Sequence, residues 1–207
     1  MIHVFVIYKN FEMTISLLDE IKQGCPNCPW KDRKSQTVPP EGPEDSPLFV
    51  VGRNPGSTED SRGRPFIGPA GKRLDQFFSD AGISRDKVYI TNTAKCYGGP
   101  GDPCPTDEVF DCCEDFLKRE IALLQPKLIM PFGFDAYRRI TGDVSPISVI
   151  QGNKTEFRHL PGWIYFPMTH PSMWLRSKGY YDRVILQAVI PQFRQVLTDL
   201  GILDQLA

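Results

Sequence analysis

The strongest constraint on the fold is a regular alternation of short apolar runs with amphipathic stretches. The apolar runs lie at 48–52, 88–90, 128–130 and 163–166. Helical patterns lie at 13–24, 69–81, 106–124, 134–141 and 180–200, the last bent or restarted near Pro191. Strands that alternate with helices form mostly parallel sheets with both faces covered. We therefore predict an α/β fold, a three-layer α/β/α sandwich around a central, mostly parallel four-stranded sheet.

The size of the chain predicts a single domain over residues 1–207, expected to be a monomer. Residues 1–12 precede a second methionine, Met13, and are interpreted as a possible N-terminal extension. The opening residues lack the basic start and cleavage site of a signal peptide, and no apolar run reaches about 18 residues. We therefore expect no membrane segment and a location in the cytoplasm of a microbe or of a virus-infected cell.

Six cysteines in such a chain indicate a metal site rather than disulfides. The pair Cys25 and Cys28 forms a C-P-N-C motif that opens a Pro-rich, charged stretch over 25–47. The other cysteines are Cys96, Cys104, Cys112 and Cys113. The stretch 25–47 is therefore predicted to be a loop that carries part of a metal centre.

The loops that follow the predicted strands carry distinctive sequences. The first reads G-R-N-P-G-S-T-E-D and continues to G-R-P-F-I-G-P-A-G, the second reads T-N-T-A-K-C, and the last reads T-H-P-S-M-W-L-R. Ligands of open α/β sheets bind at the carboxyl ends of the strands. These loops are therefore expected to meet at one site.

These strings, in this order and with the upstream C-P-N-C, resemble family 4 of the uracil-DNA glycosylases, the iron–sulfur type. The resemblance runs from about Cys25 to Arg176. It implies a monofunctional DNA glycosylase of base excision repair. Such an enzyme flips a uracil or modified pyrimidine out of DNA, hydrolyses its N-glycosidic bond and leaves an abasic site.

The same resemblance implies a [4Fe–4S] cluster. Its ligands would be Cys25, Cys28, Cys96 and Cys113. Cys112 is the alternative to Cys113 as the fourth ligand. A zinc ion held by the same four thiolates is the alternative metal.

The resemblance also implies the base pocket. Phe66 corresponds to the ring that stacks on the base, and Asn92 to the amide that reads the pyrimidine edge. His170 would donate a hydrogen bond to the pyrimidine O2 as negative charge develops there. The simpler alternatives are a core phenylalanine for Phe66 and a loop-capping asparagine for Asn92.

The loop after His170 would contact DNA. Its residues are Ser172, Met173, Trp174, Leu175 and Arg176. Apolar side chains there would fill the space that the flipped base leaves, while the serine and the arginine would contact phosphate. The alternative is that Trp174 and Leu175 are packed. The basic segment 62–73 is either a phosphate-binding face or a solvated surface.

The first loop departs from the family pattern. Family 4 has a glutamate where this chain has Arg53, and the string G-R-N-P-G is similar to the G-I-N-P-G of the mismatch-specific glycosylases. That similarity implies that Asn54 positions the attacking water and is catalytic together with His170. Arg53 would contact a phosphate or the base itself, which favours modified pyrimidines beside uracil as substrates.

Two other interpretations remain open at this stage. Loss of the glutamate fits an iron–sulfur protein that senses a base in DNA without cleaving, and the net charge of −1 is unusual for a nucleic-acid binder. An iron–sulfur electron carrier would explain the cysteines alone. Among the supporting residues, Glu59 and Asp60 are expected to brace the first loop. Lys95 either contacts DNA or lies beside the cluster.

Overall fold

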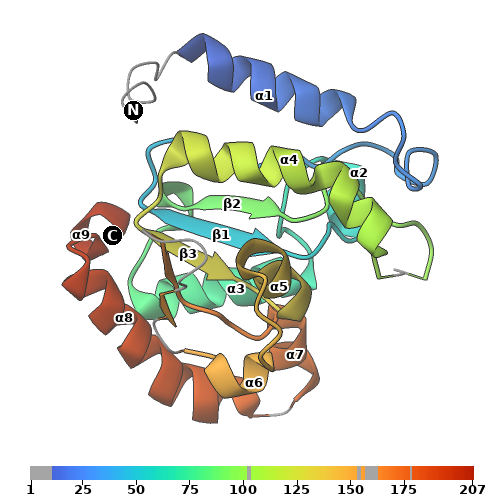
Figure 1. The fold of residues 1–207 in the computed structure, drawn as a ribbon. Coiled ribbons are helices and arrows are strands. Elements are labelled where there is room, and N and C mark those ends of the chain that lie inside the picture. Colours follow the sequence, from blue (N-terminus) through green and yellow to red (C-terminus); the bar gives the residue numbers. More distant parts are fainter. Residues whose placement is uncertain (1–10, 102–103, 153–154, 157–162, 178) are drawn as a thin grey trace.

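A computed structural model gives the structure and describes residues 11–101, 104–152, 155–156, 163–177 and 179–207. Its sheet has the strand order β2-β1-β3-β5-β4 (Figure 1). The bounds are β1 Leu48–Gly52, β2 Tyr89–Asn92, β3 Leu128–Pro131, β4 Thr155–Glu156 and β5 Ile164–Tyr165. Strands β2, β1, β3 and β5 are parallel, whereas β4 pairs antiparallel with β5 at the edge. The predicted parallel four-stranded centre is confirmed, and β4 is an addition.

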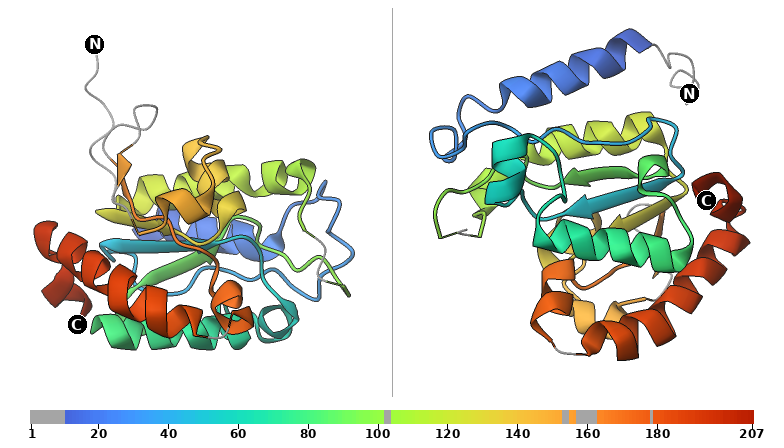
Figure 2. Two further views of the ribbon diagram at one scale, coloured as in Figure 1. Left: turned by 90° about the horizontal axis from the view of Figure 1, so that it is seen from below. Right: turned by 180° about the vertical axis from the view of Figure 1, so that it is seen from behind.

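Helices cover both faces of the sheet, as the edge-on view in Figure 2 shows. One face carries α3 (Pro69–Ala81), α7 (Pro171–Arg176), the π-helical η2 (Tyr181–Val189), α8 (Ile190–Asp199) and α9 (Leu203–Leu206). The opposite face carries α4 (Asp107–Leu124) and α5 (Phe134–Thr141). Helix α1 (Phe11–Gln23) packs outside α4. The predicted three-layer α/β/α sandwich is thereby confirmed.

The strands are buried on both faces because their side chains alternate between the two cores. In β1, Leu48 and Val50 join the core under α3 and α8, whereas Phe49 and Val51 join the core under α4. None of these four side chains is exposed. Each such burial contributes about 1.5–3 kcal/mol. Strand β1 therefore fixes the centre of the molecule, and its end at Gly52 is held rigidly.

Helix boundaries follow local sequence signals. Helix α3 begins after Gly68 with Pro69 in its first turn, and ends at Gly82, whose φ of 70° is accessible to glycine without strain. The final helix changes from π-helical to α-helical geometry just before Pro191. Proline has no N–H to continue the ladder and crowds the preceding turn, so the predicted break near this residue is confirmed.

Short elements were not predicted from the sequence. They are α2 (Ser57–Arg62), η1 (Arg85–Lys87), α6 (Ile147–Ile150), α7, α9 and β4. Elements of two to six residues are too short to display a helical or strand period. The possible extension over 1–12 lies outside the described residues as far as residue 10, and α1 begins at Phe11. Within the described part of the chain, no helix has the length and apolarity to cross a membrane.

Candidate active site

The carboxyl ends of the parallel strands meet at one edge of the sheet. Gly52 at the end of β1 pairs in register with Asn92 at the end of β2. Beyond β3 and β5, Gly133 donates a backbone hydrogen bond to Met168 at 2.7 Å, so the segment that leads to His170 runs beside the start of α5. A Cβ on Gly133 would lie 3.4 Å from the Cβ of His170. The loops with the distinctive sequences therefore converge, as expected.

Three of the predicted pocket residues surround the end of β1. The ring of Phe66 and the side-chain oxygen of Asn92 both press against Gly52, where an added Cβ would lie 2.5 Å from Asn92 Oδ1 and would overlap the phenylalanine ring. The rings of Phe66 and His170 have centroids 6.0 Å apart. Only glycine at position 52 permits this approach. A stacking ring, an amide and an imidazole thus come together from three separate loops.

Phe66 is held in a backbone conformation that non-glycine residues rarely adopt. Its φ is 51°, which costs about 1–3 kcal/mol for such a residue. The guanidinium of Arg85 donates to the carbonyl oxygens of Pro65 and Phe66 at 2.8 and 3.0 Å. Gly71 lies so close that a Cβ there would overlap the Phe66 carbonyl. The surrounding structure therefore determines the position of this ring more tightly than its own preference does.

Glu59 organises the first loop from within. Its buried carboxylate accepts backbone hydrogen bonds from Gly56, Ile67 and Gly68 at 3.2, 3.0 and 2.7 Å. The next residue, Asp60, accepts the backbone N–H of Ser35 at 3.0 Å and so ties the segment 25–47 to α2. Both carboxylates have the bracing contacts that the sequence led us to expect. With its oxygens directed at backbone N–H groups, Glu59 is poorly placed to act as a general base.

His170 is oriented by the helix that it caps. The Nδ1 atom accepts the backbone N–H of Ser172 at 3.3 Å and lies 2.9 Å from the Ser172 hydroxyl. An Nδ1 that accepts places the single ring hydrogen on Nε2. Burial, together with the nearby cations Arg53 and Arg176, lowers the pKa of His170 to about 4. The ring is therefore a neutral imidazole at pH 7 that can donate a hydrogen bond from Nε2.

The two residues that distinguish the first loop interact directly. Arg53 Nε donates to Asn54 Oδ1 at 2.7 Å, and Asn54 Nδ2 donates to the carbonyl of Pro55 at 2.9 Å. These bonds fix which way the amide of Asn54 points. An amide oxygen has two lone pairs, so Oδ1 retains one for a water molecule. Arg53 Nη1 also lies 3.0 Å from the sulfur of Cys104, a contact that spans 51 residues and that no sequence pattern indicated.

Helix α7 divides the predicted DNA-contacting residues into two groups. Met173 and Leu175 expose 52% and 45% of their surfaces. Trp174 exposes only 2%, packs against Phe77 and Phe132, and donates from Nε1 to Thr169 Oγ1 at 2.8 Å. Its position agrees with the packed alternative, because successive residues of a helix point in different directions. We therefore assign Trp174 to the core rather than to the DNA-contacting surface.

The cysteines gather beside the second loop. Cys28 and Cys96 are buried with Trp30, and Cys25 and Cys112 pack against the same cluster. Cys113 is also buried, and all six cysteines are free thiols. Among the described residues, no three His, Cys, Asp or Glu side chains stand in the geometry of a metal-binding group.

Electrostatic interactions nevertheless connect five of these sulfurs, those of Cys25, Cys28, Cys96, Cys112 and Cys113. Neighbouring thiols, including those of Cys113 and Cys28, help to raise the pKa of Cys25, and burial together with the same two neighbours raises the pKa of Cys96 to about 12. The neighbouring Cys25 thiol, followed by the backbone of Lys95, lowers the pKa of Cys113 to about 7. Thiols gathered in this way supply the soft sulfur donors that suit a cationic iron or zinc centre.

The basic segment 62–73 is partly neutralised within the protein. Arg64 makes two hydrogen bonds to the carboxylate of Glu41, at 3.0 and 2.7 Å, and the guanidinium of Arg73 lies 4.8 Å from the centre of the Tyr181 ring. Arg62 and Lys72 are exposed. Of the four cations in this segment, these last two are the better candidates for phosphate contacts.

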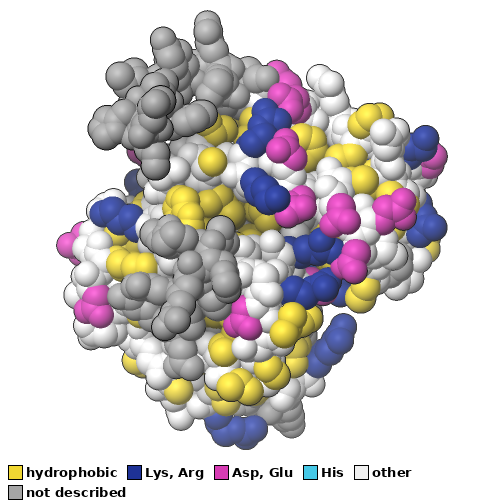
Figure 3. Space-filling view, in the orientation of Figure 1, with side chains coloured by type: hydrophobic (Ala, Val, Ile, Leu, Met, Phe, Trp, Pro, Cys, Tyr) yellow, Lys and Arg dark blue, Asp and Glu magenta, His cyan; other side chains and the backbone are white. Residues whose placement is uncertain are grey.

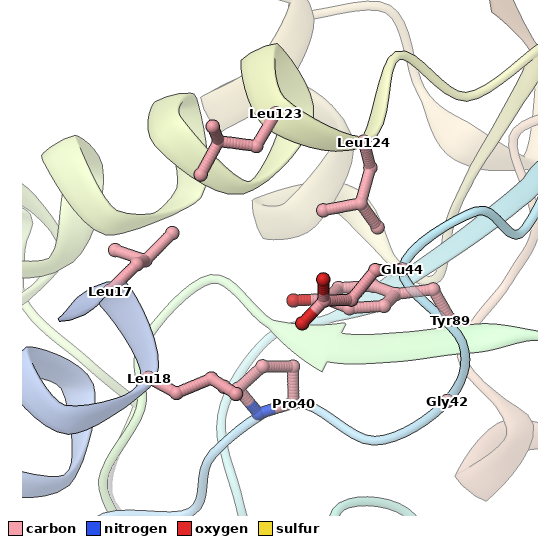
Figure 4. A pocket seen from close by; sticks show the side chains of 8 residues that line it. All are labelled: Leu17, Leu18, Pro40, Gly42, Glu44, Tyr89, Leu123 and Leu124. Atoms are coloured by element: carbon pink, nitrogen blue, oxygen red, sulfur yellow. The ribbon is translucent and has the colours of Figure 1, made fainter. Parts of the chain in front are cut away.

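A small cavity of about 50 Å³ lies away from these loops (Figure 4). It is bounded by α1, α4 and the chain near Gly42, and its lining residues are Leu17, Leu18, Pro40, Gly42, Glu44, Tyr89, Leu123 and Leu124. None of the predicted site residues contributes to it. We interpret it as a packing gap beneath α1 rather than as a base pocket.

Comparison with known proteins decides the family. The model of the uracil DNA glycosylase superfamily matches residues 39–194. The chain belongs to this superfamily. It is 32% identical over 180 residues to the type-4 uracil-DNA glycosylase of Thermotoga maritima, covering 86% of this chain and 92% of the relative. The type-4 uracil-DNA glycosylase of Sulfurisphaera tokodaii is 30% identical over 188 residues, covering 86% of this chain and 84% of the relative.

A third relative, the type-4 uracil-DNA glycosylase of Pyrobaculum aerophilum, is 36% identical over 121 residues, covering 58% of this chain and 61% of its own. The family predicted from the loop sequences is thereby confirmed. So is the class of enzyme, a DNA glycosylase of the uracil-DNA glycosylase superfamily. The roles of single residues are separate questions.

Proposed function

We propose that this chain hydrolyses the N-glycosidic bond of a flipped uracil or modified pyrimidine in DNA and leaves an abasic site. The observation that carries the proposal is the convergence of Phe66, Asn92 and neutral His170 around the end of β1. These groups supply a stacking surface, a reader of the base edge and a hydrogen-bond donor. They are what cleavage of a flipped base requires.

Substrate binding falls to Phe66 and Asn92. The phenylalanine ring would stack on the flipped pyrimidine, and the strained but braced loop keeps the ring in place before the base arrives. The amide of Asn92 can donate and accept, as the mixed edge of a pyrimidine requires. Because the amide presses against Gly52, its orientation depends on the ends of β1 and β2 rather than on a mobile loop.

His170 would assist departure of the base. As the bond from the sugar C1′ to the base nitrogen breaks, its electron pair moves onto the base and negative charge develops on O2. A neutral Nε2–H can donate to that oxygen without transferring its proton. One such donor contributes about 3–4 kcal/mol to transition-state stabilisation in comparable sites.

Asn54 would position the water that attacks C1′. Its oxygen accepts Arg53 Nε and has a second lone pair for the water. The oxocarbenium-like sugar is electrophilic enough that the water needs orientation more than deprotonation. One proton of the water is then released as the new C1′–O bond forms, and the base departs as an anion.

Arg53 lies where it can influence which base is accepted. It holds Asn54, and its charge contributes to the low pKa of His170. A cation beside the pocket favours bases with an anionic or strongly polar substituent. We therefore include modified pyrimidines with uracil in the proposed substrate class.

The DNA-binding surface is assigned to the loop edge of the sheet. Exposed Met173 and Leu175 are suited to fill the space left by the flipped base, and Arg176 to contact phosphate. The Ser172 hydroxyl faces His170 Nδ1, so we assign this serine to orienting the imidazole as well as to the DNA surface. The face in Figure 3 carries acidic and basic side chains intermixed, and the described residues on it show no continuous basic surface.

We assign the [4Fe–4S] cluster to Cys25, Cys28, Cys96 and Cys113, with iron–sulfur preferred to zinc because the relatives are type-4 enzymes. The cluster would supply a structural cross-link between the segment 25–47, the second loop and α4. Cys113 is preferred to Cys112 because its side chain is buried, whereas that of Cys112 is partly exposed. Free thiols of this kind persist in a reducing cytoplasm, the proposed compartment.

A base-release panel tests the function. Oligonucleotides carrying uracil, a thymine mismatch or a substituted cytosine are incubated with the wild type, His170→Ala and Asn54→Ala. We expect excision of at least one base by the wild type and a loss of about 100-fold or more for His170→Ala. Gln195→Ala, which removes an exposed amide on α8, is the matched control for Asn54→Ala and should retain full activity.

Two outcomes would contradict parts of the proposal. DNA binding without release of any base would favour the non-cleaving, base-sensing alternative, which the replacement of the family glutamate by Arg53 makes worth testing. Activity confined to uracil would contradict the broader substrate class.

A further inference from the structure

A buried ion pair lies between the cysteine cluster and the base-reading loop. Lys95 and Glu120 have their charged atoms 2.5 Å apart, and their side chains are 1% and 0% exposed. Lys95 comes from the loop after β2, and Glu120 lies on the buried side of α4. Burial at this depth excludes the DNA contact that the sequence left open for Lys95.

Every hydrogen of the Lys95 amine has a partner. It donates to Thr91 Oγ1 at 2.6 Å, to the backbone carbonyl of Asn92 at 2.8 Å and to Glu120 at 2.5 Å. The second oxygen of Glu120 accepts from Thr91 at 3.0 Å and from the hydroxyl of Tyr89 at 3.2 Å. The network therefore fixes the backbone at the end of β2, where Asn92 lies.

The backbone of Lys95 is tied to the metal side of the molecule. Its carbonyl accepts the N–H of Val38 at 2.8 Å, and the next residue along the chain is Cys96. Lys95 thus makes two connections. Its backbone adjoins the cysteine cluster, and its side chain binds the carbonyl of Asn92.

Stability alone does not account for such a pair. Removing two charges from water costs several kcal/mol for each ion, and well-packed apolar residues are often as stabilising as a buried ion pair. The pair does define the local geometry, because the three N–H groups of the Lys95 amine meet three acceptors in fixed directions.

We infer that Lys95 and Glu120 are positioning residues that couple the cysteine cluster to the orientation of Asn92. This inference rests on the proposed role of Asn92 as reader of the base. Without the pair, the fold and the cluster persist. The amide of Asn92, however, is no longer held in the orientation that hydrogen bonding to the pyrimidine edge requires.

The test measures the contribution of the base to DNA affinity. Dissociation constants are compared for two oligonucleotides, one carrying 2′-fluoro-2′-deoxyuridine, which resists cleavage, and one carrying a tetrahydrofuran abasic analogue. The ratio of the two isolates recognition of the base, because general loss of folded protein affects both equally. Iron content and the visible absorbance of the cluster are measured on the same samples.

We expect Lys95→Met to reduce this ratio about tenfold, the equivalent of roughly one good hydrogen bond, while iron content stays within the range of the wild type. Thr91→Val removes only the hydroxyl that joins the two charges and should reduce the ratio about threefold, which keeps the test valid if Lys95→Met does not fold. Asn92→Ala sets the lower limit of the ratio. Val196→Ala on α8 is the control, because it loosens the core on the opposite face of the sheet, away from the network.

Three results would overturn the inference. The ratio could remain at the wild-type value in both network variants, it could fall equally in Val196→Ala, or it could fall only in proportion to lost iron. If the ratio does not change in Asn92→Ala, then Asn92 does not read the base. That result identifies the failure as one of the proposed function rather than of the coupling.

Discussion

The low pKa of His170 gives a quantitative prediction for the pH dependence of stability. The ordinary pKa of a histidine is 6.5, and burial with the cations Arg53 and Arg176 lowers it to about 4. A difference of about 2.5 units corresponds to about 3 kcal/mol. Because the folded pKa is the lower one, the unfolded chain takes up the proton first as the pH falls. His170 therefore reduces the free energy of unfolding by up to about 3 kcal/mol between pH 6.5 and 4.

The matched variant is His170→Gln, which keeps a neutral amide at the site and cannot titrate. Urea unfolding of both proteins between pH 7 and 4 should give curves that differ increasingly below pH 6.5, with the wild type losing more stability. The chain has three histidines, so the imidazole resonance that disappears in His170→Gln identifies this residue in an NMR titration. Arg53→Met should raise its pKa more than Arg176→Met does, because Arg53 has the larger influence.

A His170 resonance that titrates near 6.5 would refute this reasoning. So would parallel unfolding curves for wild type and His170→Gln. With a normal pKa the ring would still be mostly neutral at pH 7 but would gain a proton just below it, so the site would no longer secure the neutral Nε2 donor over a wide pH range.

Three other predictions concern the loops and the cluster. Gly71→Ala should destabilise the protein by about 1–3 kcal/mol and reduce excision, because the new methyl group would displace the loop of the stacking ring; thermal unfolding and base release measure the two effects. Cys113→Ser should lower iron content and Cys112→Ser should not, and the reverse result would exchange the two assignments. Leu175→Ala should weaken excision from duplex more than from single-stranded DNA, whereas Leu186→Ala, on η2 and 41% exposed, should change neither; equal losses on both substrates would contradict a wedge.

Much of the fold could be predicted because its signals are local. The apolar runs gave the four parallel strands, and helices α3 and α5 have the predicted bounds because glycines mark their ends. The edge strand β4 is two residues long and has no period to detect. The order of strands in the sheet was not predicted, because it depends on tertiary packing.

The candidate site was predicted as a set of residues and not as a set of interactions. The approach of Phe66, Asn92 and His170 followed from the rule that strand ends share one edge of a sheet. The contact of Arg53 with Cys104 and the burial of Lys95 with Glu120 join residues far apart in the sequence. One signal in the sequence indicated the pair of Lys95 and Glu120. Glu120 lies on the same side of α4 as the core residues Leu117 and Leu124, and an acid among core positions needs a buried partner.

The neighbouring carboxylates of α2 have a consequence for the order in which the molecule assembles. Glu59 accepts hydrogen bonds from the loop that carries the stacking ring. Asp60 accepts hydrogen bonds from the backbone N–H groups of residues 35 and 36, which precede β1. The N-terminal cysteine segment thus docks onto a surface that exists only after β1 and α2 have formed. The proposed ligands are spread from Cys25 to Cys113, so they come together only after the sheet has joined the segments that carry them. We therefore expect a newly made chain to complete its glycosylase core first and to acquire its metal last, so iron limitation would yield folded apoprotein rather than unfolded chains.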